Sequence, residues 1–231
     1  MSGLFTNCLN LQALNLSNFD TSLVTDMNNM FFLCSTLQSL DLSNFNTSLV
    51  TNMLQMFVGC SQLKILDLTN FDTSLVTNMQ HMFINCKQLQ SLNLSHFDTS
   101  LVTDMEELFY GCNQLQSLDI SNFNTNLVTN VKNMFKGLNS IKYINIYNIK
   151  DDNKLISALS QFLNNNITQN IIICQSQTIL NKTNIITSCD YNNYIIVKYS
   201  KETKYTKFIN DNRNSISYII NEDKIISNIS I

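Results

Sequence analysis

Cysteines are the residues whose type and spacing first suggest chemistry in this sequence. Five recur every 26 residues, at Cys8, Cys34, Cys60, Cys86 and Cys112. Cysteine metal sites usually place paired ligands two to four residues apart, so a far longer interval does not fit them. Free thiols are common as small apolar core groups. The spacing therefore predicts a column of buried, unpaired cysteines and no metal site.

Other candidates for chemistry are few. Cys174 and Cys189 lie outside the series and are either a disulfide formed in an oxidising compartment or two free core thiols. His81 and His96 occupy different repeat positions, so we expect two surface substitutions and no shared site. The four glycines form no phosphate-binding loop, and no zinc-protease or nucleophile-elbow motif occurs. We expect no catalytic residue, no cofactor and no enzyme.

The 26-residue period predicts the fold. It lies within the range of leucine-rich repeats, and Leu37, Leu40, Leu42 and Phe45 match the repeat pattern. Apolar and polar residues alternate over 40–43, which predicts a short strand with leucines inward. We expect an α/β repeat, a leucine-rich-repeat solenoid in which each coil has a short parallel strand and a short helix.

The second half of each coil carries a different apolar spacing. Val50, Met53 and Phe57 fall at the intervals of one helix face, so we expect a short helical return arm with Thr51 as its N-cap. The recurring methionines have the same spacing and are predicted to be core residues rather than a soft binding stripe. They are Met27, Met30, Met53, Met56, Met79, Met82, Met105 and Met134.

The repeat ends near residue 150, which predicts two domains. Residues 1–150 form the solenoid, and residues 151–231 form a capping helix over 151–163 followed by a small α+β or β module. The apolar runs that predict this module are 171–174, 194–199, 204–209 and 217–220. Met1 aligns with Met27, so the sequence starts within a coil, and we expect a fuller form with more coils.

Stacked strands would present two columns of outward side chains, which we name the strand-face ladder. We expect it either to bind a protein partner or to be a solvated face whose amides bond along the stack. A further column, Asp20, Asn46, Asp72, Asp98 and Asn124, is expected to close Asx turns. The strand-face ladder consists of Asn15, Ser17, Asp41, Ser43, Asp67, Thr69, Asn93, Ser95, Asp119, Ser121, Asn145 and Tyr147.

Composition restricts the class of partner. The chain has 231 residues, of which 13% are charged, and a net charge of -3. This balance lacks the basic patch of a nucleic-acid-binding protein. No apolar run approaches the roughly 18 residues of a membrane span. We therefore expect a protein partner, no nucleic acid and no membrane span.

One motif resembles a known family. The pattern L-x-x-L-D-L-S-N-F-D-T-S-x-V-T-N-M-x-x-M-F-x-x-C, seen over Leu63 to Cys86, resembles the 26-residue repeats of BspA-like leucine-rich-repeat surface proteins. The resemblance implies a cell-surface or secreted adhesin-like protein that binds host cell-surface or extracellular-matrix proteins. The alternatives are an intracellular leucine-rich-repeat scaffold for protein–protein interaction and a hydrolase whose site lies in residues 164–231.

Overall fold

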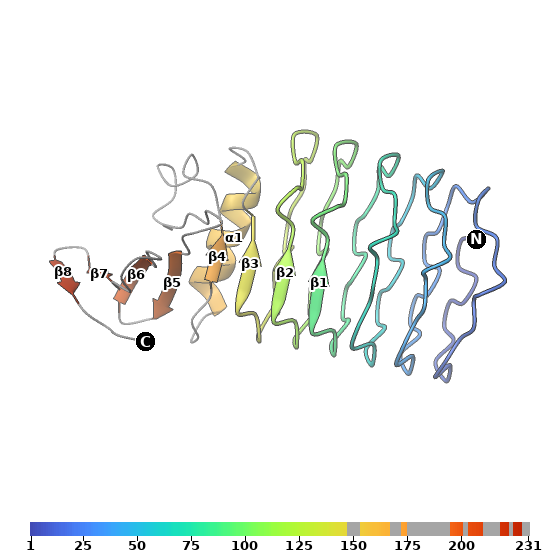
Figure 1. Cartoon of the computed structure of the whole chain (residues 1–231), viewed down its shortest axis with the longest axis horizontal. Helices are drawn as coiled ribbons and strands as arrows, with labels where there is room; N and C mark the ends of the chain where they lie inside the picture. The colour runs from blue at the N-terminus through green and yellow to red at the C-terminus, as the bar shows by residue number, and fades with distance from the viewer. Residues whose placement is uncertain are drawn as a thin grey trace.

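The repeats build a solenoid of coils that stand side by side in a row, as Figure 1 shows. This arrangement agrees with the predicted repeat solenoid, but parallel strands occur in the described structure only from Ser91 onward. Residues 40–43, predicted to be a strand, form none. Isolated parallel bridges join equivalent residues of successive coils, from Asp26 to Asn52, Asn78, Asp104 and Asn130. The computed structural model describes residues 1–146, 153–166, 172–174, 195–200, 203–209, 218–221 and 224–227.

A parallel sheet lies along one side of the solenoid. Its strands are β1 (Ser91–Asn93), β2 (Ser117–Asp119), β3 (Tyr143–Asn145) and β4 (Ile172–Cys174), in that order. Leu92 pairs with Leu118, which pairs with Ile144, and all three side chains are buried. Neighbouring positions point outward because side chains alternate along a strand. The predicted inward and outward alternation is therefore confirmed at these strands.

The predicted helix in each return arm was wrong. We take the return arm as residues 53–60 and the equivalent residues of other coils, and it is a chain of tight turns. The Met56 N–H donates to the Met53 carbonyl at 3.3 Å, and the Cys60 N–H donates to the Phe57 carbonyl at 3.1 Å. Gln55 and Gly59 have φ values of +57° and +70°. A positive φ at the third residue of a turn is typical of type II turns and ends a helix.

Backbone bonding between coils explains the difference. The Met53 N–H donates to the Asn78 carbonyl at 2.9 Å, and the Phe57 N–H donates to the Met82 carbonyl at 2.9 Å. These groups therefore bond the next coil instead of closing helical turns within their own. Thr51 is not an N-cap, because its hydroxyl donates to the Thr25 carbonyl at 3.2 Å. The apolar spacing resembles that of a helix because the tight turns of the return arm, like a helix, bury the side chains of one face.

The core is built from columns of identical side chains. A phenylalanine column runs through the return arms with successive ring centroids 5.5 to 6.3 Å apart. The eight methionines predicted to be core residues are all buried, which confirms that prediction. The phenylalanines of the column are Phe5, Phe31, Phe57, Phe83, Phe109, Phe135 and Phe162.

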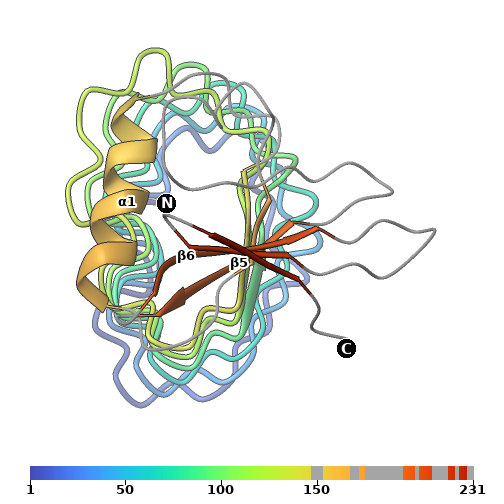
Figure 2. The same ribbon diagram turned by 90° about the vertical axis from the view of Figure 1, so that its left-hand side faces the viewer.

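Helix α1 (Asn153–Asn166) takes the place of a return arm in the last coil. Its Leu159 is buried, and the Phe162 ring lies 6.3 Å from that of Phe135. Figure 2 shows α1 on one side of the stack and the strands on the other. A helix thus lies where the sequence predicts one over 151–163, with different bounds. Asp151 and Asp152, expected at its start, lie outside the described residues.

The sheet extends past the expected boundary at residue 150. Ile144 of β3 pairs with Ile173 of β4, so the closing coil spans 29 positions instead of 26. The run 171–174, expected in a separate module, therefore supplies the last strand of the solenoid sheet.

Two antiparallel strand pairs follow at the C-terminal end of the row. Strand β5 (Ile195–Ser200) pairs with β6 (Thr203–Ile209), and β7 (Tyr218–Asn221) pairs with β8 (Lys224–Ser227). The first three of these strands coincide with the predicted runs 194–199, 204–209 and 217–220.

Removing one ring from the phenylalanine column should weaken the whole stack. We expect Phe83→Ala to lower the free energy of unfolding by about 3–5 kcal/mol, because a fully buried aromatic leaves a cavity. Ile65→Ala is the matched control, since Ile65 is 71% exposed and its loss should change stability by no more than about 0.5 kcal/mol. Urea unfolding followed by circular dichroism measures both. Equal effects would contradict the packing role.

Candidate functional site

The strand-face ladder is exposed over its N-terminal half and partly covered beyond it. Asn145 is half-buried, Ser121 is only 7% exposed and offers no outward surface, and Tyr147 lies outside the described residues. Ser95 and Asp119 are half-buried as well. The exposed members are Asn15, Ser17, Asp41, Ser43, Asp67, Thr69 and Asn93.

The carboxylates of this ladder are held in fixed positions by local turns. Asp41 Oδ1 accepts a hydrogen bond from the Ser43 N–H at 2.9 Å, and Asp67 Oδ1 accepts one from the Thr69 N–H at 3.0 Å. Two hydrogen bonds from Ser43 lower the pKa of Asp41, and the bond from its hydroxyl contributes more than the bond from its N–H. The pKa of Asp67 is lowered chiefly by the Thr69 N–H. Both side chains thus stay ionised at neutral pH.

The expected Asx turns of the second column are confirmed. Asp72 Oδ1 accepts the Ser74 N–H at 3.0 Å, and Asn46 Oδ1 accepts the Ser48 N–H at 3.0 Å. The strand-face ladder also forms Asx turns, although the sequence analysis predicted them only for the column that contains Asp72 and Asn46. The missed signal was a Ser or Thr two residues after each Asp or Asn, which both columns share across several coils.

An asparagine between the two columns ties neighbouring coils together, and sequence reasoning missed it. Asn70 Nδ2 donates to the Leu42 carbonyl at 3.0 Å and to the Phe45 carbonyl at 2.9 Å. His96 occupies the equivalent position one coil later, where its Nε2 lies 2.8 Å from the Leu68 carbonyl. His96 is exposed as expected, yet it also has this cross-coil contact. A recurring Asn at positions 18, 44, 70 and 122 was the available signal.

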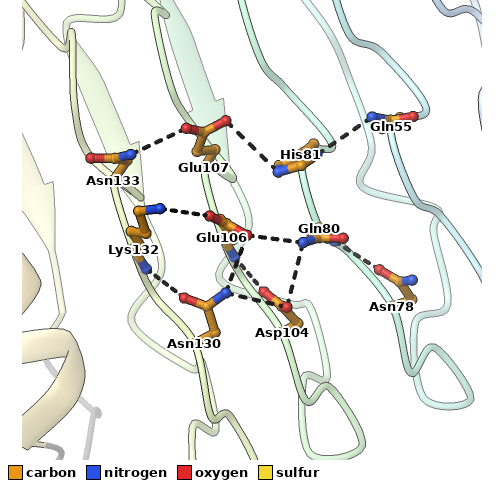
Figure 3. A network of polar contacts seen from close by, with 10 residues as sticks. All are labelled: Gln55, Asn78, Gln80, His81, Asp104, Glu106, Glu107, Asn130, Lys132 and Asn133. Carbon is orange, nitrogen blue, oxygen red and sulfur yellow. Dashed lines mark hydrogen bonds and ion pairs between the residues drawn. The ribbon is translucent and has the colours of Figure 1, made fainter.

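A polar network covers the return arms of four successive coils (Figure 3). The amide of Gln80 contacts Asp104 Oδ2 at 3.4 Å and Glu106 Oε2 at 3.1 Å. Asn130 Nδ2 contacts the same two oxygens at 3.4 and 3.2 Å, from the opposite side. Lys132 Nζ lies 3.7 Å from Glu106 Oε1. Two amides and one ammonium group therefore compensate this carboxylate pair.

His81 belongs to the same face and is half-buried, so it is less exposed than expected of a surface substitution. Its Nδ1 lies 3.4 Å from Gln55 Nε2, and its Nε2 lies 3.7 Å from Glu107 Oε2. Asn133 Nδ2 donates to the other oxygen of Glu107 at 3.2 Å. The network therefore links one coil to the next, and in the described part of the chain no group of three His, Cys, Asp or Glu is placed to hold a metal ion.

The cysteine column is buried and unpaired, as its spacing predicted. Cys34, Cys60, Cys86 and Cys112 are buried free thiols, and Cys8 is half-buried. Cys60 Sγ donates to the Phe31 carbonyl of the preceding coil at 3.3 Å. Burial raises the pKa of Cys34 to about 11 and raises that of Cys60 further. The side chain of Cys174 and the whole of Cys189 lie outside the described residues, so their pairing stays a prediction.

A family assignment follows from comparison with known proteins. The chain matches the model of the family described as Mycoplasma protein of unknown function, DUF285, over residues 1–65 and 55–172. This match covers more than half of the sequence, and the chain belongs to this family. No curated protein and no solved structure matches the chain. Among the described residues, no helix has the length and apolar character needed to cross a bilayer.

The position of each thiol predicts its reactivity. We expect iodoacetamide at pH 8 to alkylate Cys8 in the folded protein and to spare Cys34, Cys60, Cys86 and Cys112, because the reagent cannot reach a buried sulfur atom. Peptide mapping by mass spectrometry measures the labelling, and alkylation in urea should label all five. Comparable native labelling of Cys60 and Cys8 would contradict the buried column.

The turn carboxylates predict an acid-sensitive stability. The pKa values of Asp41, Asp67 and Asp72 are lowered in the folded state, so their contribution is full above the ordinary aspartate pKa and lost as the pH falls through the lowered values. We expect the melting temperature to fall as the pH decreases from about 5 to about 3.

Replacing the three aspartates with Asn tests this linkage. Asn closes the same turn at Asn15 and Asn93, so the fold should be retained. The triple variant should lose less melting temperature over this pH range than the parent, as measured by thermal unfolding. Identical losses in the two proteins would show that other groups cause the acid sensitivity.

Proposed function

We propose that this chain is a non-enzymatic, protein-binding repeat protein of the BspA-like leucine-rich-repeat type, displayed at the cell surface or secreted. The proposal is supported above all by one observation, the exposed strand-face ladder in constant register. Where its residues lie on paired strands, from Asn93 to Asp119 and Asn145, its side chains repeat at the spacing of neighbouring strands, about 4.8 Å. The partner we infer is a protein of the host cell surface or the extracellular matrix.

Rigidity makes this surface suitable for recognition. Backbone bonds between coils fix the sheet, and local turns fix Asp41 and Asp67. Ordering flexible side chains on binding costs free energy, and a preformed surface avoids much of that cost. Asn145 Nδ2 also donates to Asp119 Oδ2 at 2.9 Å, which orders the far end of the ladder.

The chemistry of the ladder favours a protein partner that offers hydrogen-bond donors. Hydroxyls and amides of Ser43, Thr69 and Asn93 alternate with the carboxylates of Asp41 and Asp67. Oδ1 of each carboxylate is engaged in its turn, and a carboxylate has further acceptor positions that an amide or a basic group of a partner could use. A flat partner surface with amide and lysine or arginine donors would suit this arrangement.

The surface location and the adhesive role are supported by the motif at Leu63 to Cys86, which resembles BspA-like repeats. Membership of the DUF285 family is consistent with a repeat surface protein.

Blocking the ladder tests the proposal. We expect Ser43→Lys combined with Thr69→Lys to reduce capture of the chain by a panel of purified extracellular-matrix proteins at least tenfold, because two bulky cations would cover the exposed centre of the surface. Surface plasmon resonance measures the capture, and thermal unfolding verifies the fold.

Ser48→Lys combined with Ser74→Lys is the matched control. These serines close the same kind of turn in the other column. Their substitution should leave capture unchanged. Equal loss in both double variants, or undiminished capture in the first, would reject the strand-face ladder as the contact surface.

A further inference from the structure

The last return arm, residues 131–138, faces helix α1 instead of another arm, and its backbone donors differ from those of the earlier arms. In the five preceding coils, the N–H of the column phenylalanine donates to a carbonyl of the next coil at 2.9 to 3.1 Å. The N–H of Phe135 has no acceptor in the described part of the chain. The N–H of Asn133 has none there either, whereas its equivalents in Glu107 and His81 donate to the next coil at 2.9 and 3.0 Å.

The direction of these two N–H groups follows from the carbonyls beside them. The Met134 carbonyl accepts the Phe109 N–H of the preceding coil at 3.1 Å, and the peptide bond to Phe135 is trans. The N–H and C=O groups of a trans peptide unit point in opposite directions. The Phe135 N–H therefore points away from the preceding coil and toward α1. The Lys132 carbonyl also accepts from the preceding coil, at 2.9 Å, which orients the Asn133 N–H in the same way.

A helix cannot complete this row of donors. Within an α-helix, all carbonyls except those of the last turn accept N–H groups four residues further along the chain. Helix α1 therefore lacks the exposed carbonyls that another return arm would offer. Phe135 is only 1% exposed, so bulk water does not replace them at this residue. A buried N–H without an acceptor costs free energy, and binding of an outside acceptor would recover it.

A cavity of about 230 Å³ lies where α1 faces the last arm. Asn133 and Phe135, which carry the two unpaired N–H groups, are part of its wall. The Phe135 and Phe162 rings, with centroids 6.3 Å apart, give it an apolar side. Lys136 and Gln161 are exposed and also line it. Among the described residues, no carboxylate belongs to this lining, so the cavity combines hydrogen-bond donors with an apolar surface.

We propose that this cavity binds a small ionised carboxylic acid whose apolar body is about the size of a benzene ring. An apolar protein cavity of about 150 Å³ is known to hold benzene. The larger volume here leaves room for a ring and one carboxylate. The carboxylate oxygens accept the N–H groups of Phe135 and Asn133, and the apolar body lies against Phe162.

The two kinds of lining together select this class of ligand. N–H groups bind an ionised acceptor more strongly than a neutral one. Lys136 adds a positive charge near the cavity, although its Nζ lies 5.5 Å from the centroid of the Tyr110 ring in the preceding coil. An inorganic anion would leave the apolar wall in water, and a hydrocarbon would leave the N–H groups unpaired. An acid with an apolar body satisfies both.

This site is separate from the strand-face ladder. Helix α1 and the strands lie on opposite sides of the stack (Figure 2). A ligand between α1 and the last arm contacts both, so it stabilises the closing coil without touching the strands. The two proposals are therefore tested independently, and failure of one leaves the other standing.

Amide NMR of the full ¹⁵N-labelled chain tests the proposal, with phenylacetate as the ligand. We expect the Phe135 and Asn133 amide signals to move saturably, with the Phe135 proton moving downfield as it gains an acceptor. The equivalent amides of Phe83 and His81 already donate to the next coil, so they should not move and serve as internal controls. No movement at about 20 mM phenylacetate, well above the millimolar dissociation constant expected of so small a ligand, would overturn the proposal.

Two related compounds test the two halves of the ligand. Phenylacetamide lacks the charge and acetate lacks the apolar body, so each should bind at least tenfold more weakly than phenylacetate. Equal affinity for phenylacetamide would overturn the choice of an anion. Equal affinity for acetate would reveal an adventitious anion site only, and would overturn the proposed class of ligand as well.

Variants on α1 locate the site. Ala158 lines the cavity, so Ala158→Leu should fill it and weaken phenylacetate binding at least tenfold. Ser157→Leu, at the exposed neighbouring position, is the matched control and should leave the affinity unchanged. Gln161→Glu is a second variant that keeps the shape of an exposed side chain, and its negative charge should weaken binding at least threefold. Unchanged affinity in Ala158→Leu and Gln161→Glu would place the ligand elsewhere and overturn the proposal.

Discussion

The constraint that organises this protein is that each coil completes the backbone hydrogen bonds of its neighbour. In the return arms, the N–H groups of Met53 and Phe57 leave their own coil and bond carbonyls of the next. Backbone hydrogen bonds also join successive coils in the parallel sheet and at the isolated bridges from Asp26 to Asn130. A buried backbone group without a partner is costly, so no coil is stable alone, and stability grows by adding neighbours.

Register follows from this constraint and accounts for the columns of identical side chains. When equivalent backbone atoms bond coil to coil, equivalent side chains must lie above one another. Phenylalanines therefore stack with centroids 5.5 to 6.3 Å apart. The four buried thiols each donate to a phenylalanine carbonyl of the preceding coil, namely those of Cys34, Cys60, Cys86 and Cys112. Outside, the same register aligns the strand-face ladder and the polar network of the return arms. One kind of interaction thus sets both the core and the arrangement of side chains at the surface.

The sequence allowed the solenoid, the strands from Ser91 onward, a helix near residues 151–163 and the buried columns to be predicted, because each depends on which side chains turn inward. The strand predicted over 40–43 is not present in the described structure. The prediction of a helical return arm was wrong because Met53 and Phe57 would be buried in a helix and in a chain of tight turns alike. The two structures differ in which carbonyls accept hydrogen bonds from the backbone N–H groups. The closing strand at Ile173 was misplaced because its partner, Ile144, lies across an irregular 29-residue coil. For the candidate surface, outward positions were predictable, but the cover over Ser121 and the bracing amide of Asn70 depend on neighbouring coils.

The sameness of the junctions between coils has a genetic consequence. A segment encoding one whole coil has ends that fit any other junction, so duplication or loss of such a segment would join surfaces that already match. Such an event would change the length of the molecule in steps of 26 residues while its cross-section stays constant.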